Sequence, residues 1–221
     1  MWWITNQKGG VNALGLKRLL GLGSYETAWT CLHKLRRATV RLGREKLSGR
    51  VEVDESFVGP KRGIFRRENL IGVLIAAEIR SKQVGRIRLK KAYGTTVKYF
   101  FEFVRKNVEL GSEIITDGGK GYEHIASYGY RHSPFPLTGR GHEASNVMLP
   151  RVHRVAALLK RWLLGMHQGA VSGKQLDYYL DEFTFRFNRR LSKHRGQLFY
   201  RLVQQAMVTG PLPYRKLIKR R

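Results

Sequence analysis

The chain has a single cysteine, Cys31, among its 221 residues. One cysteine excludes a disulfide framework or a thiolate metal cluster within the chain, and it is typical of a reducing compartment. No uninterrupted apolar run approaches the roughly 18 residues of a membrane span, and the first residues lack the features of a secretory signal. These absences predict a cytoplasmic protein that does not enter a membrane.

Acidic residues are also scarce, since 16 Asp and Glu stand against 42 Lys and Arg and give a formal net charge of +26. An excess of this size, spread along the chain, favours a polyanionic partner, with nucleic acid well ahead of a membrane surface. The hydrophobic content of 42% and aromatic content of 11% are typical of a folded protein. The length allows one sizeable domain and a small appendage.

Two short helices are expected near the N-terminus, over residues 12–20 and 25–37, with Gly and Ser between them to end one helix and cap the next. Such a pair has helix-turn-helix dimensions, and it would turn outward the candidate DNA-contacting cations Lys34, Arg36 and Arg37. His33 is expected at the surface or at a helix cap. A plain helical hairpin stays open as an alternative.

The middle of the chain predicts a mixed α/β sheet. Residues 51–59 alternate apolar and acidic side chains, residues 69–79 form an apolar run, and residues 83–91 alternate cations with Ile and Leu. An amphipathic helix over 95–107 and a short strand over 113–116 follow. The first and fourth strands of this order could lie side by side.

Two carboxylates mark these strands, Asp54 within the first and Asp117 directly after the fourth. If the strands are neighbours, the two charges repel unless a cation lies between them, which indicates a metal, with Mg²⁺ preferred. Two independent strand-end Asp residues are the alternative. In a later helical region, His153 and Lys160 are seven residues apart and therefore share one helix face.

This order of Asp54, Asp117, a third ligand and a Lys resembles that of RNase H-like DDE transposases. The chain specifically resembles insertion-sequence transposases of the ISXO type. V-E-V-D-E-S-F-V-G and I-I-T-D-G-G-K-G-Y match the two Asp blocks of that family, and L-D-E-F-T-F-R-F-N-R-R matches its C-terminal signature. The resemblance covers nearly the whole chain. It implies a DNA-contacting segment over 1–48, an RNase H-like α/β sheet flanked by helices over 49–210, and a basic tail over 211–221.

The resemblance also implies a DNA transposase that cleaves element ends and joins them to target DNA, acting on duplex terminal inverted repeats as a homodimer or larger assembly. Asp54 would bridge two Mg²⁺ ions, with Asp117 and His153 completing one shell each. Mn²⁺ is possible because imidazole is a softer donor than carboxylate. Lys160 would contact a phosphate near the transposon end. Further candidate DNA contacts are the cations Lys61, Arg62, Arg161, Arg189 and Arg190.

Two departures from the family pattern leave alternatives open. One cysteine cannot build the zinc ribbon that precedes the catalytic core in this family, and His153 stands where many DDE enzymes have Glu. A DNA-binding remnant without chemistry and an RNase H-like nuclease are therefore the competing hypotheses. Glu52 and Glu55 are the nearest substitutes for Asp54, whereas Glu182 is expected to brace one of the arginines that follow it.

Overall fold

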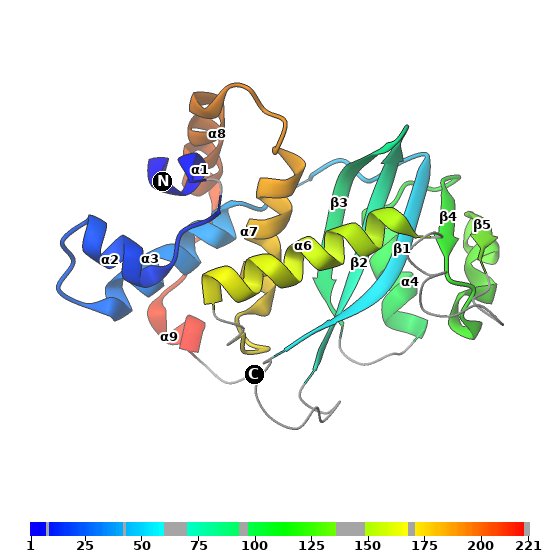
Figure 1. Ribbon diagram of the computed structural model, residues 1–221, viewed down its shortest axis with the longest axis horizontal. Coiled ribbons are helices and arrows are strands. Elements are labelled where there is room, and N and C mark those ends of the chain that lie inside the picture. Colours follow the sequence, from blue (N-terminus) through cyan, green and yellow to red (C-terminus); the bar gives the residue numbers. More distant parts are fainter. Residues whose placement is uncertain are drawn as a thin grey trace. The chain divides into compact units, whose positions relative to one another are not determined.

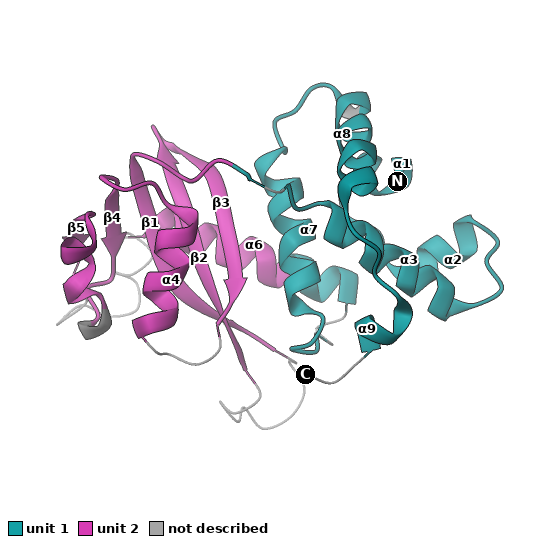
Figure 2. Cartoon of the chain, turned by 180° about the vertical axis from the view of Figure 1, so that it is seen from behind, with its two compact units in different colours: residues 1–44, 162–221 teal, residues 45–161 magenta. Residues whose placement is uncertain are grey.

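The computed structural model describes residues 1–7, 9–41, 43–59, 70–92, 97–135, 149–167 and 171–218. The predicted DNA contacts Lys61 and Arg62 lie outside the described residues. The chain forms two compact units, one of residues 1–44 with 162–221 and one of residues 45–161 (Figure 2). Among the described helices, none combines the length and apolar character that a membrane span requires.

A five-stranded mixed sheet, in the order β3-β2-β1-β4-β5, forms the centre of the 45–161 unit (Figure 1). β1 and β3 are antiparallel to β2, whereas β4 is parallel to β1 and β5 is parallel to β4. This is the RNase H-like α/β sheet that the sequence predicted, with β1 and β4 side by side. The strands are β1 (Arg50–Val58), β2 (Ile71–Arg80), β3 (Gln83–Lys91), β4 (Glu113–Thr116) and β5 (Arg131–Pro134).

Helices cover both faces of this sheet. Views from opposite sides show α4 (Val97–Asn107) on one face and α6 (Pro150–His167) on the other (Figures 1 and 2). Val51 and Val53 of β1 share a core with Phe100 and Phe103 of α4. Since strand side chains alternate, the acidic residues between and beyond these valines point to the α6 face. The strand alternation that buries the valines therefore gathers the carboxylates on the opposite face. A 3₁₀ segment, η2 (Lys120–Tyr128), follows β4.

The other unit is helical, and its first helices form as the sequence predicted. The Asn12 side chain accepts a hydrogen bond from the Gly15 N–H at 2.6 Å, and the Ser24 hydroxyl accepts one from the Glu26 N–H at 3.1 Å. These two N-caps fix the starts of α2 and α3. The helices are α1 (Trp2–Asn6), α2 (Ala13–Leu19), α3 (Tyr25–Ala38), α7 (Leu176–Asn188), α8 (Arg195–Val208) and α9 (Tyr214–Ile218).

Arg36 of α3 requires a correction, because it faces the interior of the helical unit and not solvent. Its side chain is 2% exposed, and its Nε donates to Glu182 Oε2 of α7 at 2.7 Å. Arg186 donates to the other oxygen of Glu182 at 2.9 Å, so one buried carboxylate serves two guanidinium groups. The guanidinium groups also donate to the backbone carbonyls of Ile4, Gln7 and Val11. Arg36 is thus part of the core and not of a DNA-contacting face.

His33 is the second correction, since it is fully buried and not at the surface or at a cap. Its ring packs against the aromatic rings of Trp29, Tyr178 and Tyr179, with centroid distances of 4.0, 5.0 and 5.6 Å. Neither ring nitrogen has a hydrogen-bond partner among the described residues. Burial, together with the nearby charge of Arg36, lowers the pKa of His33 to about 3.

We expect His33→Leu to stabilise the protein, and more so in acid. The folded-state pKa lies below the unfolded value, so the unfolded chain binds the proton more tightly and stability is lost as pH falls below about 6.5. Removing two unpaired buried nitrogens should raise the free energy of unfolding by about 1–3 kcal/mol at neutral pH. The gain should then grow by up to ~1.4 kcal/mol per pH unit below about 6.5.

Urea unfolding of wild type and variant across this pH range measures the effect. His194→Leu is the matched control, because His194 is exposed in the same unit and its substitution should produce no such pH-dependent gain. Parallel pH profiles for wild type and His33→Leu would contradict the prediction.

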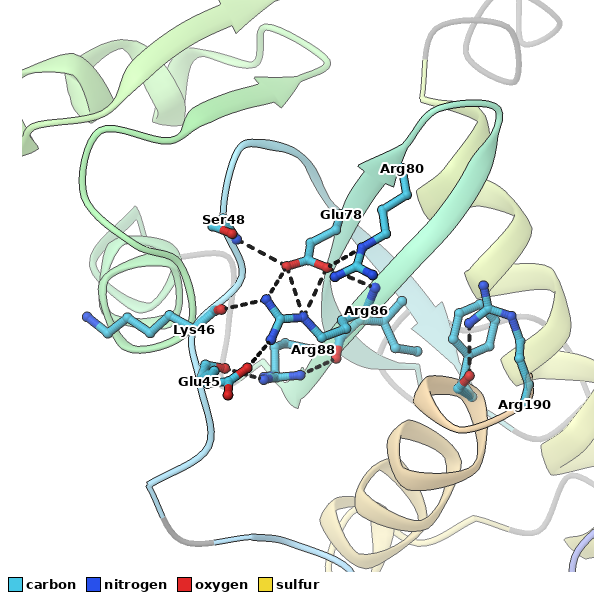
Figure 3. A network of polar contacts seen from close by, with 10 residues as sticks. Glu45, Lys46, Ser48, Glu78, Arg80, Arg86, Arg88 and Arg190 are labelled. Carbon is cyan, nitrogen blue, oxygen red and sulfur yellow. Dashed lines mark hydrogen bonds and ion pairs between the residues drawn. The ribbon is translucent and has the colours of Figure 1, made fainter. Parts of the chain in front are cut away.

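A second buried carboxylate, Glu78 of β2, organises the edge of the sheet unit (Figure 3). It accepts hydrogen bonds from the backbone N–H groups of Ser48 and Arg86, both at 3.1 Å, and from the Arg86 guanidinium at 2.6 Å. Arg86 also reaches Glu45 at 2.9 Å. Arg88, 4% exposed, donates to the Glu45 carbonyl at 2.6 Å. Arg86 and Arg88, two of the cations predicted along β3, therefore bind acceptors of the protein itself.

Candidate active site

The register between β1 and β4 brings two carboxylates to one edge of the sheet. The parallel pair Glu52–Ile115 is the last of the ladder. Asp54 lies two residues beyond Glu52 in β1, and Asp117 lies two residues beyond Ile115, directly after β4. The pKa of Asp54 is raised to about 7, mainly by burial and also by the charges of Asp117 and Glu55, and a hydrogen bond from the Glu55 N–H at 2.7 Å opposes this rise. Asp54 and Asp117 thus lie within electrostatic reach of each other.

His153 of α6 approaches the same carboxylate, with its Nε2 atom 4.0 Å from Asp54 Oδ2. Burial lowers the pKa of His153, the Glu52 charge opposes that shift, and the Lys160 charge adds to it. A neutral imidazole keeps the lone pair that a metal ligand needs. Lys160 is exposed two helical turns further along α6, and its charge contributes to the lowered pKa of His153. Such an interaction is expected of two residues on one helix face.

Glu52, one of the substitutes considered for Asp54, is already engaged elsewhere. It is 1% exposed, and it accepts hydrogen bonds from the backbone N–H groups of Arg151 and Val152 at the start of α6. Its oxygens are therefore not free to bind an ion. Glu55 is half-buried beside Asp54, and burial together with the Asp117 charge raises its pKa.

Tyr122 is a site residue that the sequence reasoning did not single out. It lies in η2, and burial raises the pKa of its phenol, with further contributions from the charges of Glu55, Asp117 and Asp54. Gly119, between Asp117 and Tyr122 in the sequence, lies close to both side chains. Its N–H donates to Asp117 Oδ1 at 3.1 Å, and a Cβ atom at this position would lie 3.4 Å from Asp117 Oδ1 and 3.4 Å from the Tyr122 ring. Tyr122 is the last residue of the second Asp block, and this position in the motif could have marked it as a candidate site residue.

Asp54, Asp117 and His153 are the candidate metal ligands of this site. Among the described residues no three His, Cys, Asp or Glu side chains form a ready metal-binding group. His153 Nε2 nevertheless lies 4.0 Å from Asp54 Oδ2, and the charge of Asp117 contributes to the raised pKa of Asp54. Two uncompensated carboxylates and one neutral imidazole are donors that suit Mg²⁺ or Mn²⁺. A cation would also offset the repulsion by Asp117 and Glu55, which adds to the effect of burial on the pKa of Asp54.

The predicted DNA contacts are spread over both units. Lys34 and Arg37 are exposed on α3, and they help to line a pocket of about 560 Å³ together with Arg215 and Lys216. Arg161 is exposed on α6. Arg189 is half-buried and Arg190 is exposed, and each lies over an aromatic ring, at 4.2 Å for Arg189 over Phe185 and 4.1 Å for Arg190 over Phe187.

Comparison with known proteins identifies the family of this chain. No curated protein matches the chain. A chain of the simian T-cell lymphotropic virus intasome, solved by cryo-electron microscopy in complex with PP2A regulatory subunit B56 gamma, is 15% identical, with a TM-score of 0.44 over 81% of this chain and 68% of that chain. Residues 46–188, more than half of the chain, match the family model of the ISXO2-like transposase domain. That segment contains both Asp blocks, His153 and Lys160, and the chain belongs to the ISXO2-like transposase family.

Proposed function

We propose that this protein is a metal-dependent DNA transposase that cleaves the ends of its element and joins them to target DNA. The observation that carries the proposal is the approach of His153 Nε2 to Asp54 Oδ2 at 4.0 Å, on a strand whose parallel pairing with β4 brings Asp117 to the same end of the sheet. The family membership of residues 46–188 supports the same reaction class.

Asp54 and Asp117 with His153 would hold two Mg²⁺ ions, or Mn²⁺, with Asp54 shared between them. When bound, such ions lower the pKa of an attacking water or 3′-hydroxyl and stabilise the leaving oxygen. Lys160, exposed on the His153 face of α6, would hold a phosphate of the substrate as a point charge.

The partner that this proposal requires is duplex DNA, comprising the terminal inverted repeats and the target. The net charge of +26 supplies the nonspecific part of that affinity. Two element ends must be brought together for transposition, so we propose a homodimer on DNA.

Lys34→Ala combined with Arg37→Ala should weaken DNA binding and reduce its dependence on salt. Each cation that neutralises a phosphate contributes about 0.9 to the slope of log K against log salt, so the double variant should lower the slope by roughly 2. Fluorescence anisotropy of labelled duplex across a salt series measures this. The control removes the exposed cations Lys98 and Lys106 of α4, and an equal loss in both double variants would contradict a specific contact by α3.

The direct test of the proposed reaction uses the full chain and a duplex that carries the inverted repeats flanking its gene. We expect strand cleavage at the repeat ends and transfer to a second duplex, in the presence of Mg²⁺ or Mn²⁺ and not in EDTA. Salt-dependent binding that is indifferent to the metal, with no cleavage, would favour the DNA-binding remnant. Cleavage of RNA–DNA hybrids or junctions without transfer would favour the nuclease.

A further inference from the structure

The first turn of α6 is held by a carboxylate from another element. Glu52 Oε2 accepts hydrogen bonds from the backbone N–H of Arg151 at 2.8 Å and from that of Val152 at 2.9 Å. The first N–H groups of a helix have no partner within the helix, and a local side chain usually satisfies them. Here the acceptor lies 99 residues earlier in the chain, on β1.

A second link fixes the same turn to the sheet. Glu52 Oε1 accepts a hydrogen bond from Arg151 Nη1 at 3.2 Å, and Arg151 Nη2 donates to the Ser81 carbonyl, in the turn between β2 and β3, at 3.0 Å. The Glu52 side chain is 1% exposed, so water does not compete for these bonds. The start of α6 is thereby tied to two points of the sheet.

These bonds connect the same two elements that form the candidate active site. Glu52 and Asp54 are two residues apart on β1 and so share its α6 face, while Val152 directly precedes His153. We infer that Glu52 is a positioning residue: by fixing the first turn of α6 to β1, it holds the His153 imidazole beside the Asp54 carboxylate. The inference rests on the proposed function, since it concerns the site through which that function would act.

Two substitutions of Glu52 separate the effect of its side-chain length from the effect of its charge. Glu52→Gln keeps the length of the side chain and an oxygen that accepts both backbone N–H bonds, but it removes the charge. Glu52→Asp keeps the charge but is one methylene shorter and withdraws the carboxylate from α6. Because hydrogen bonds to the helix do the positioning, the Gln variant should behave like wild type and the Asp variant should not. Arg151→Ala leaves both backbone bonds in place and removes only the side-chain link, so it should have a smaller effect than Glu52→Asp.

Two readouts test the inference on the full chain. The first is amide hydrogen exchange without metal, where we expect the Arg151 and Val152 amides to exchange at least about tenfold faster in Glu52→Asp and to be little changed in Glu52→Gln. The second is calorimetric titration with Mn²⁺, where Glu52→Asp should bind roughly 10–100-fold more weakly and Glu52→Gln within about threefold of wild type.

A matched control removes another buried carboxylate of the sheet unit. Glu78 likewise binds two backbone N–H groups and an arginine, but it pairs with Val51 and so lies on the α4 face of the sheet. Glu78→Gln should leave the Mn²⁺ affinity and the exchange of the α6 amides unchanged.

Unchanged exchange at the start of α6 in Glu52→Asp would overturn the inference, as would a Gln variant that loses as much Mn²⁺ affinity as the Asp variant. The two readouts also separate this inference from the proposed function. If wild type failed to bind Mn²⁺, the proposed metal site would be wrong, while the exchange comparison would still decide whether Glu52 holds the first turn of α6.

Discussion

Asp54→Asn and Asp117→Asn should each reduce strand cleavage and strand transfer by roughly 10³-fold or more. Each substitution replaces a carboxylate by an amide of the same shape, so the loss falls on ion binding and not on packing. At Asp54 the change also removes a buried charge that Asp117 and Glu55 repel, and the variant should be at least as stable as wild type. Gel analysis of labelled repeat-end duplexes with Mg²⁺ measures the rates.

Two comparisons sharpen this prediction. Residues that act as one unit have non-additive effects, so the double variant should be little worse than either single variant. The exposed carboxylate of Glu109 provides the control, and Glu109→Gln should retain the wild-type rate. DNA binding should persist in all of these variants. Wild-type strand transfer by both Asp variants would exclude catalysis by this pair.

Glu182→Ala should cost about 3–5 kcal/mol of unfolding free energy, which is the largest stability effect that we expect in the chain. The substitution leaves two guanidinium groups without their shared carboxylate, one of them on a side chain that is only 2% exposed. Glu182→Gln should be milder, because its amide oxygen still accepts one of the two hydrogen bonds. Urea unfolding of the variants against wild type measures these losses.

The exposed acid of the same unit, Glu26, is the control for this loss. Glu26→Ala removes a carboxylate from the first turn of α3 and should cost no more than about 1 kcal/mol. Equal costs for Glu26→Ala and Glu182→Ala would show that the buried cluster contributes no more than a surface charge near a helix end.

Strand patterns in the sequence predicted that Asp54 and Asp117 would share one edge of the sheet if their strands were neighbours. Alternation placed the first strand, the apolar run placed the second, and Asp117 directly follows a strand whose bounds, Glu113–Thr116, are as predicted. The RNase H-like order of strands then follows from the resemblance, and the structure confirms it. The parallel register of β1 and β4 brings the two carboxylates to one edge.

The residues that the sequence could not place have partners far along the chain. Helical periodicity gives α3 its faces, but it does not show that Arg36 meets a carboxylate 146 residues later or that aromatic rings of α7 cover His33. Glu52 has the same difficulty, since alternation put it on the Asp54 face without revealing the helix start that it holds. Local patterns specify elements and their faces, whereas buried polar pairs depend on tertiary packing.

The most direct test of the metal-dependent mechanism is a crystal structure of the protein grown with Mn²⁺ and measured at a wavelength that reveals the metal by anomalous scattering. We expect Mn²⁺ density between the Asp54 and Asp117 carboxylates, with oxygen ligands at roughly 2.2 Å, and a second ion between Asp54 and His153 when DNA is bound. Mn²⁺ bound only elsewhere, or a well-ordered Asp54–Asp117 pair with no ion at saturating metal, would contradict the account.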